Sequence, residues 1–389
     1  MKFVARQFVF ASCATLFSFF AHATDNSVSI SPAEKAAIVS LGPWPPKFIR
    51  DVSNRHSGKP HAQALGKKLF FASGLSGDGT RACASCHNPG LLFTDARALA
   101  LGVLPLTRHT PSVVNLGAAR WFGWGGESDS LWSHSIRPLL AKNEMGSSAG
   151  HIRNFLSTQT ALGREFSSVT GGAANRLDDD SLLAELGKVL AAYQETLVTP
   201  RTAFDLFRDA LENNNEAKTR AYPAAAVRGL KLFIGSAQCV LCHSGPSFTN
   251  GEFAEIGIPY FTHSGVDSGR YSGIKIVVNS RFNLLSPYND DPNRDSSSRH
   301  TRHVSLSQRN WGEFKVPSLR SVAHTAPYMH NGSIATLREV VQHYSNMDLD
   351  RIHADSGSLL RPLKLTKSQI DDLLAFLSTL GSDNGTLTH

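Results

Sequence analysis

GLKLFIGSAQCVLCH, residues 229–243, repeats the pattern of an earlier stretch, GKKLFFASGLSGDGTRACASCH, residues 66–87. Each stretch begins with Gly-x-x-Leu-Phe and ends with Cys-x-x-Cys-His. Two thiols on one helical turn can form thioethers with the two vinyl groups of a haem, and the adjacent imidazole then lies beneath the iron. The sequence therefore predicts two covalently bound haem c groups, and the residues expected to hold them are Cys83, Cys86, His87, Cys239, Cys242 and His243.

Other uses of paired cysteines fit this pattern less well. A zinc site needs further thiol or imidazole ligands at close spacing, and a thioredoxin-like centre is expected in a βαβ context without a His after the second Cys. Structural disulfides are common in exported proteins, but they do not require that His either. Covalent haem is the use that explains every residue of both motifs.

The repeat extends beyond the cysteines and predicts two similar domains. Phe93-Thr94-Asp95 follows the first motif, and Phe248-Thr249-Asn250 follows the second. In each half, an amphipathic helix with Leu and Phe on its inner face leads into the haem loop, and apolar residues at helical spacing predict a closing helix over 368–380. We expect a mostly α fold of two cytochrome c-like haem domains with long irregular loops.

The predicted organisation is a signal peptide at 1–23, an N-terminal haem domain at 24–205 and a C-terminal haem domain at 206–389. Between the motifs, residues 178–193 have helical periodicity, whereas the polar stretch 213–221 is predicted to be a linker. Residues 262–304 are rich in Ser, Asn, Asp, Arg and Gly and show little periodicity except around 274–278. We expect them to form a long exposed loop.

The N-terminus predicts export. Lys2 and Arg6 precede an apolar run that ends at Phe20, and Ala21-His22-Ala23 matches an A-x-A cleavage site. Cleavage after Ala23 would deliver the protein to the periplasm. The run is too short for a stable membrane span, and its continuation past Cys13 argues against that residue as a lipoprotein site.

Composition places the chain among globular proteins. Of its 389 residues, 41% are hydrophobic and 18% are charged, which excludes fibrous and wholly disordered classes. Removal of the signal leaves +5 of the formal charge of +7. Because four haem propionates reduce it further, we expect no nucleic-acid partner. No later stretch approaches the roughly 20 apolar residues of a spanning helix, so we expect no membrane span.

Several further motifs occur in a characteristic order. They are Arg108-His109-Thr110-Pro111-Ser112, Trp124-Gly125-Gly126, Glu144-Met145, the stretch AYQETLVTP at 192–200, and 314–332. With the haem motifs, this order resembles the bacterial di-haem cytochrome c peroxidases and their MauG-like relatives over most of the mature chain. The resemblance implies a peroxide-reactive haem in the N-terminal domain and an electron-transferring haem in the C-terminal domain.

For the first haem, the resemblance implies an open iron. The peroxidases cap this iron with a His that falls within 98–104 here, but that stretch contains none, as in the MauG-like branch. Glu144 matches the family's catalytic Glu, which moves a proton between the peroxide oxygens, and His134 falls where many members carry Gln. Pro138 matches a pocket wall. Taken alone, an isolated Glu is more often solvated and an isolated His more often structural.

Trp124 matches the aromatic residue that family members place between the two haems. The resemblance therefore implies that its indole relays electrons between the irons. The other reading is core packing, since large aromatic side chains usually bury area.

The second haem differs from that of the peroxidases. Their axial Met falls on Tyr344, where MauG-like enzymes also carry Tyr. A phenolate is an anionic, hard donor that favours higher iron oxidation states, so iron ligated by His243 and Tyr344 would store an oxidising equivalent. Met347, three residues on, and His343 remain alternative ligands, and Tyr344 could instead be a packed aromatic on a helix.

The family also binds calcium between the domains, through an Asn side chain and the backbone carbonyls of a Thr and a Pro. Thr325 and Pro327 match two of these positions. His109 occupies the Asn position, and imidazole is a poor ligand for a hard cation that prefers oxygen. Calcium therefore stays an open expectation.

The resemblance implies a periplasmic di-haem oxidoreductase that uses hydrogen peroxide at the first haem. Its high-valent state would be shared with the His/Tyr-ligated second haem and would oxidise an aromatic residue, above all Trp, of a partner protein. A cytochrome c peroxidase that draws electrons from a small cytochrome or copper protein is one alternative, and a non-enzymatic electron carrier is another. Carriers usually have both axial positions filled, so an open iron argues against the carrier.

Overall fold

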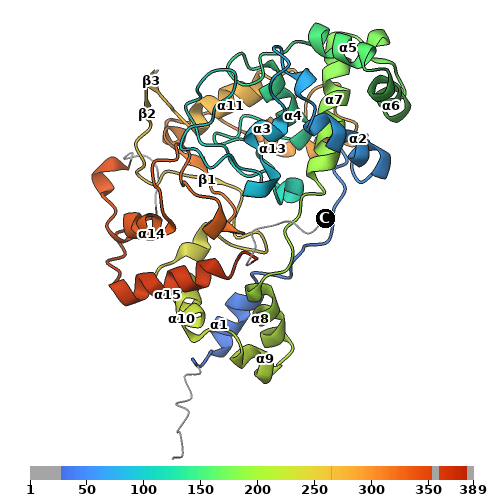
Figure 1. Cartoon of the computed structure of the whole chain (residues 1–389). Coiled ribbons are helices and arrows are strands. Elements are labelled where there is room, and N and C mark those ends of the chain that lie inside the picture. Colours follow the sequence, from blue (N-terminus) through green and yellow to red (C-terminus); the bar gives the residue numbers. More distant parts are fainter. Residues whose placement is uncertain (1–27, 264, 353–358, 383–389) are drawn as a thin grey trace, which may run out of the picture.

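The computed structural model describes residues 28–263, 265–352 and 359–382 and is mostly helical, as predicted (Figure 1). The predicted signal peptide and Cys13 lie outside these residues. The helices are α1 Pro32–Val39, α2 Pro60–Phe70, α3 Cys83–Cys86, α4 Leu131–Leu140, α5 Ala149–Thr158, α6 Thr160–Thr170, α7 Asp179–Gln194, α8 Ala203–Glu212, α9 Glu216–Arg220, α10 Ala224–Ile234, α11 Arg270–Val278, α12 Arg294–Ser297, α13 Arg299–His303, α14 Leu337–Ser345 and α15 Lys367–Ser378.

Strands are short and form two antiparallel pairs in the described residues. β1 (Phe253–Ala254) pairs with β4 (Phe314–Lys315), so that Phe253 is opposite Lys315. β2 (Phe261–Thr262) pairs with β3 (Gly265–Val266). The first pair connects segments on either side of α11 to α13, and the second is a local hairpin.

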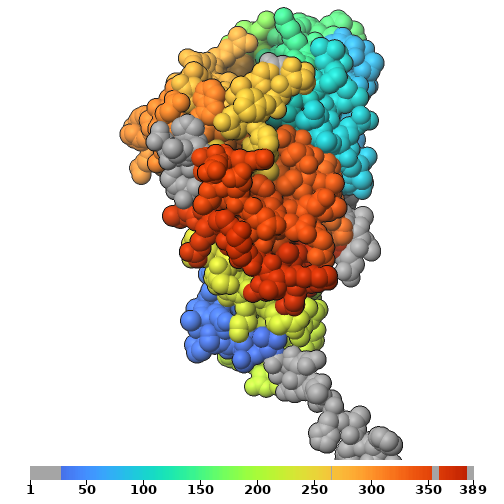
Figure 2. All heavy atoms as spheres, turned by 90° about the vertical axis from the view of Figure 1, so that its left-hand side faces the viewer, coloured from blue at the N-terminus to red at the C-terminus, as the bar shows by residue number. Residues whose placement is uncertain are grey.

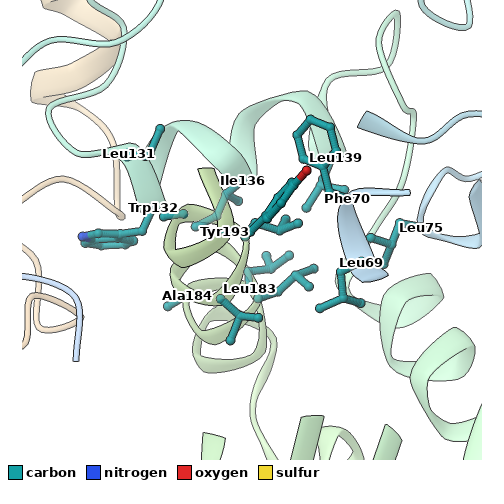
Figure 3. Close-up of a cluster of buried hydrophobic side chains, with 14 of the residues drawn as sticks. Leu69, Phe70, Leu75, Leu131, Trp132, Ile136, Leu139, Leu183, Ala184 and Tyr193 are labelled. Atoms are coloured by element: carbon teal, nitrogen blue, oxygen red, sulfur yellow. The ribbon is translucent and has the colours of Figure 1, made fainter. Parts of the chain in front are cut away.

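The first core forms where α2, α4 and α7 pack together (Figure 3). Gly66 lets α2 approach α7 closely, because a Cβ there would lie 2.2 Å from the carbonyl oxygen of Val189. One turn further along α7, the ring of Tyr193 lies edge-on to Phe70 with centroids 5.3 Å apart. Burial of this apolar surface holds α2 beside the first haem motif.

The second core repeats this arrangement with α10 and α15. A Cβ at Gly229 would lie 1.9 Å from the carbonyl oxygen of Asp372. One turn further along α15, Phe376 packs against Phe233 with centroids 5.1 Å apart. The Gly-x-x-Leu-Phe repeat in the sequence therefore serves the same close helix crossing in both halves.

The two cores do not follow the order of the chain. Ile38 of α1 and Leu41 just after it belong to the second core, while Phe282 and Leu284 belong to the first. Figure 1 shows α1 beside α8 to α10 at the bottom, and Figure 2 shows the blue N-terminal segment against this lower part. Each core takes residues from both sides of position 205, which itself lies within α8. The domain division at that position stays a prediction.

Two local expectations are wrong, and two are confirmed. Residues 213–221 are not simply a linker, because α9 occupies 216–220. Residues 262–304 contain α11, α12 and α13 and add apolar side chains to the first core. Polar composition concealed α12 and α13, which contain no apolar residue, whereas α11 covers the run 274–278 where periodicity was visible. The helices expected over 178–193 and 368–380 are α7 and α15.

Candidate active site

Each haem motif holds its histidine in the same way. His87 Nδ1 lies 3.0 Å from the carbonyl oxygen of Phe93, and His243 Nδ1 lies 3.1 Å from that of Phe248. Both phenylalanines have positive φ, 59° and 51°, which turns their carbonyls toward the imidazoles. A ring whose Nδ1–H donates to a carbonyl leaves Nε2 free for a metal.

The surroundings of both histidines suit an axial ligand. Burial lowers the pKa of His243 to about 4 and also lowers the pKa of His87, so both rings are neutral near pH 7. The neighbouring thiols form no disulfide in the structure. No group of three or more His, Cys, Asp or Glu side chains in the described ranges could hold a metal ion, which disfavours zinc.

A cavity of about 970 Å³ opens in front of the first motif. Cys83, Cys86 and His87 line it together with Glu144 and Trp124. Both thiols and the free imidazole nitrogen therefore border one volume, which is the arrangement that a covalently attached haem requires. The residues present fit the group.

The helix α4 supplies one wall of this cavity. Its N-cap, Ser130, accepts a hydrogen bond from the backbone N–H of Ser133, and the helix carries both His134 and Pro138 into the lining. Burial lowers the pKa of His134 to about 3, so its imidazole is neutral over the physiological range. Its Nδ1 is buried with no partner among the described residues.

Glu144 lies in a loop whose backbone is fastened to the segment 98–104. The amides of Val103 and Leu104 donate to the carbonyls of Glu144 and Asn143 at 2.8 and 3.0 Å. Gly102 permits this contact, because a Cβ there would lie 2.6 Å from the Glu144 Cα. The stretch in which the peroxidases carry their capping His thus serves here as a support for Glu144.

Burial raises the pKa of the Glu144 carboxyl above its ordinary value. The Arg137 charge opposes this shift, and the nearby Glu127 carboxylate adds to it. A carboxyl with a raised pKa in the lining of this cavity can accept and return a proton.

The sequence did not reveal a buried charge network beside the pocket. Arg108 forms an ion pair with Glu127 and a bidentate pair with Asp267, at 2.6 and 2.7 Å. Burial raises the pKa of Glu127, but the charges of Arg108 and Arg137 outweigh it and hold this pKa below its ordinary value. Asp267 is 159 residues from Arg108, so no local spacing could have linked them. Glu127, directly after the Trp-Gly-Gly motif, was a sequence signal that could have pointed to this charge network.

Trp124 lies in the cavity lining, as do residues 244–247 of the second motif's loop. Its indole N–H donates to the carbonyl of His109 at 2.9 Å, and its own carbonyl accepts from the backbone N–H of Lys315 at 2.8 Å. These bonds fix an indole in a cavity that residues of both haem loops line. Its relay role stays a prediction.

Near the second motif, Tyr344 is half-buried, and its hydroxyl lies within electrostatic range of the thiols of Cys239 and Cys242. Burial raises its pKa, and the charges of Cys239 and Cys242 as thiolates would raise it further. His343 instead directs Nε2 to the carbonyl oxygen of Ile256 at 2.7 Å. Met347 is also buried. Tyr344 is therefore a neighbour of Cys239 and Cys242, whereas the side chain of His343 is bonded to a backbone carbonyl.

The residues considered for calcium share one cavity. His109, Thr325 and Pro327 all line the large cavity. His109 Nδ1 lies 2.7 Å from the carbonyl oxygen of Arg97, which leaves only an imidazole Nε2 where an amide oxygen would serve calcium better. Calcium stays an expectation that this side chain disfavours.

The chain is similar to known di-haem proteins over most of its length. Residues 60–213 match the family described as di-haem cytochrome c peroxidase. The chain is 32% identical over 331 residues to the methylamine utilization protein MauG of Methylorubrum extorquens, covering 85% of this chain and 80% of the relative. It is 30% identical over 363 residues to the cytochrome-c peroxidase IdrP1 of Denitromonas iodatirespirans, covering 90% and 88%.

Solved structures show the same fold. A MauG-like protein associated with microbial copper homeostasis matches with a TM-score of 0.64 and 25% identity, over 88% of this chain and 96% of that chain. The di-haem peroxidase BthA of Burkholderia thailandensis matches with a TM-score of 0.66 and 21% identity, over 84% and 87%.

Fold and site together define a di-haem c-type peroxidase, an oxidoreductase. The chain belongs to the di-haem cytochrome c peroxidase and MauG family. Membership implies two haem c groups and hydrogen peroxide as substrate. None of the helices in the described ranges combines the length and apolar character needed to cross a membrane.

Proposed function

We propose that this protein is a periplasmic, MauG-like enzyme that uses hydrogen peroxide to oxidise an aromatic residue, above all Trp, of a partner protein. The observation that carries the proposal is the contrast between the two sites. The first borders a cavity lined by Glu144 and His134, whereas the second has the half-buried Tyr344 within electrostatic range of its thiols.

Hydrogen peroxide would bind in the cavity between His87 and Glu144. A haem held by Cys83, Cys86 and His87 supplies the redox chemistry that cleaves the O–O bond. The Glu144 carboxylate takes the proton from one peroxide oxygen and returns it to the other, so that water can leave. The neutral His134 holds the peroxide, and Pro138 limits access to the pocket.

The second site would stabilise oxidised iron. His243 and Tyr344 supply a neutral and an anionic ligand, and an anionic oxygen donor favours the higher oxidation state. Trp124 lines the cavity that residues of both haem loops also line, and it would carry electrons between the sites. Two electrons could thus be withdrawn from a partner without damage to the first site.

A cytochrome c peroxidase is the second candidate, because IdrP1 and MauG are similarly related to this chain. The axial ligand separates the two functions. Magnetic circular dichroism of the oxidised protein should show one high-spin five-coordinate haem and one low-spin haem without a Met charge-transfer band. Two six-coordinate haems, or a Met band, would contradict the MauG-like proposal.

Tyr344→Met should convert the second haem to a readily reduced, Met-ligated site. Val341→Met, one turn earlier on the same helix, is a control for the added thioether and should leave the spectrum unchanged. An unchanged spectrum and potential in Tyr344→Met would show that another residue is the ligand.

The substrate is sought directly by incubating holoenzyme and peroxide with the proteins encoded beside its gene. Mass spectrometry should find added oxygen or a cross-link at an aromatic residue of one of them. Trp124→Phe should prevent this modification while haem content is retained, because Phe still fills the space at a modest packing cost. Equal modification by the variant would assign Trp124 to packing.

A further inference from the structure

A serine supports the loop that follows each haem motif. Ser112 and Ser318 each follow a proline in the sequence. The Ser112 hydroxyl donates to the carbonyl of Leu92 at 2.6 Å, and the Ser318 hydroxyl donates to the carbonyl of Ser247 at 2.7 Å. Each of these carbonyls belongs to the residue just before the phenylalanine that faces the haem histidine with its own carbonyl. Both histidines are therefore supported from outside the Cys-x-x-Cys-His motifs.

The two supports differ two residues after the serine, where the first half has Val114 and the second has Arg320. Val114 belongs to the first core. Arg320 Nε instead donates to the carbonyl of Pro246 at 2.6 Å, and its two terminal nitrogens donate to the Asp205 carboxylate at 2.9 and 3.0 Å. The side chains of Arg320 and Asp205 are 0% and 1% exposed. The second haem loop is thus tied to a buried ion pair at the position where the first half has an apolar side chain.

The buried ion pair is itself held in place. The guanidinium carbon of Arg320 lies 3.7 Å from the ring centroid of Trp44 and 5.6 Å from that of Phe248. Asp205, at the start of α8, also accepts from the backbone N–H of Thr202 at 2.8 Å. A hydrogen bond from a charged donor is shorter and stronger than one between neutral groups. Arg320 can therefore fix the position of the loop that contains Phe248.

We infer that Arg320 is a positioning residue for the second haem: through the Pro246 carbonyl it fixes the loop that directs the Phe248 carbonyl to His243. A histidine that donates Nδ1–H to a well-placed carbonyl is a more basic ligand, and a more basic ligand favours the ferric state. The position of this loop therefore lowers the reduction potential of the second haem. The inference goes beyond the proposed function, because it concerns the His243 side of the haem and holds whatever the enzyme oxidises.

The first test measures the loop directly in the holoenzyme. Arg320→Met/Asp205→Asn removes both charges together and so leaves no unpaired charge buried. Hydrogen exchange followed by mass spectrometry reports on peptides that contain 243–249 and 87–93. Exchange should become about tenfold faster at 243–249, as expected for loss of a hydrogen bond to a charged group, and stay unchanged at 87–93. Equal changes in both peptides, or none in either, would overturn the inference.

A redox titration then separates positioning from packing. In Arg320→Met/Asp205→Asn, one haem potential should rise and the other should stay at its wild-type value, because a weaker Nδ1–H bond makes His243 a poorer donor to ferric iron. Ser318→Ala should raise the same potential by less, whereas Ser112→Ala should raise the other. Two unchanged potentials in the double variant, or movement of the potential that Ser112→Ala moves, would show that Arg320 only fills space.

The matched control makes the same two substitutions in another ion pair of the second core. Arg228 of α10 and Asp372 of α15 form a bidentate pair at 2.7 and 2.9 Å. Arg228→Met/Asp372→Asn should leave both potentials and the exchange at 243–249 unchanged. A change equal to that in Arg320→Met/Asp205→Asn would mean that loss of any ion pair suffices, which contradicts a specific role for Arg320.

Arg320→Lys keeps the inference testable if the double variant does not fold. Lysine keeps a positive charge beside Asp205 but lacks the planar fork that reaches Asp205 and Pro246 together. The potential that Ser318→Ala raises should also rise in Arg320→Lys. Wild-type potentials and wild-type exchange at 243–249 in Arg320→Lys would overturn the inference.

Discussion

The two haem motifs hold their histidines in the same local structure, but different side chains lie opposite the two imidazoles. Phe93 packs against Phe70 with centroids 6.1 Å apart, and Phe248 packs against Phe233 at 6.0 Å. In both halves, a glycine permits the helix crossing and a residue at positive φ directs its carbonyl to the imidazole. The repeat therefore preserves the contacts that hold each histidine. The residues on the other side of each imidazole differ between the two halves.

That divergence assigns different chemistry to each half. The first motif faces a cavity with a titratable carboxyl and a neutral imidazole, so it can handle protons. The second faces a phenol near its thiols and has no comparable acid–base pair among the described residues. The proposed function would accordingly assign proton transfer to the first site and charge storage to the second.

The largest effect on the rate with peroxide is expected from loss of the Glu144 carboxyl. Glu144→Gln should leave both haems in place and slow the reaction with peroxide by about 10² to 10⁴-fold, since the amide cannot accept the proton. Stopped-flow mixing with peroxide measures this rate. Glu165→Gln, at the surface ion pair with Lys68, is the control and should react normally. Unchanged speed in Glu144→Gln would remove it from the mechanism.

The close helix crossing that both halves share can be tested by measuring the free energy of unfolding. Gly66→Ala and Gly229→Ala should each lower the free energy of unfolding by about 1–3 kcal/mol, because the new methyl overlaps a backbone carbonyl across the helix crossing. Denaturant unfolding followed by circular dichroism measures the loss. Gly117→Ala is the control, since no atom lies within 4 Å of its added Cβ. Wild-type midpoints in either core variant would show that this crossing is not tight.

A smaller effect should appear in the pH dependence of the first site. Glu144 acts as a base, so the rate is full above its pKa and falls about tenfold per unit as pH drops below it. Because the pKa of Glu144 is raised, this fall should begin above the ordinary glutamate value of 4.5. His134, with a pKa of about 3, stays neutral throughout. A flat profile in wild type, or the same inflection in Glu144→Gln, would contradict this assignment.

The mildest effect is expected at His134. His134→Gln should reduce the rate with peroxide by less than about tenfold, because a neutral amide can still hydrogen-bond the peroxide. The same stopped-flow assay checks it. A loss as large as that in Glu144→Gln would instead make His134 the proton-transfer group.

The haem-binding motifs and the long helices could be predicted from local sequence. The spacing of Cys83, Cys86 and His87 lies within one turn, and the helical periodicity of 178–193 is visible in the same short window. The helices α12 and α13 were missed because their sequences, RDSS and RHTRH, contain no apolar residue to give a period. The sequence did not show that Ile38 packs in the second core, because the other residues of that core, such as Phe204, are distant in the chain.

The sequence by itself determined the cofactor chemistry, the helical class and the candidate residues, because thioether attachment and helical burial depend on short, regular spacings. Only the tertiary structure decided which groups meet. It joined Arg108 to Asp267, supported Glu144 on Gly102, and placed Trp121 beneath α13. Charges and aromatic rings interact over a few ångströms of space, whatever length of chain separates them, and a linear pattern holds no record of those distances.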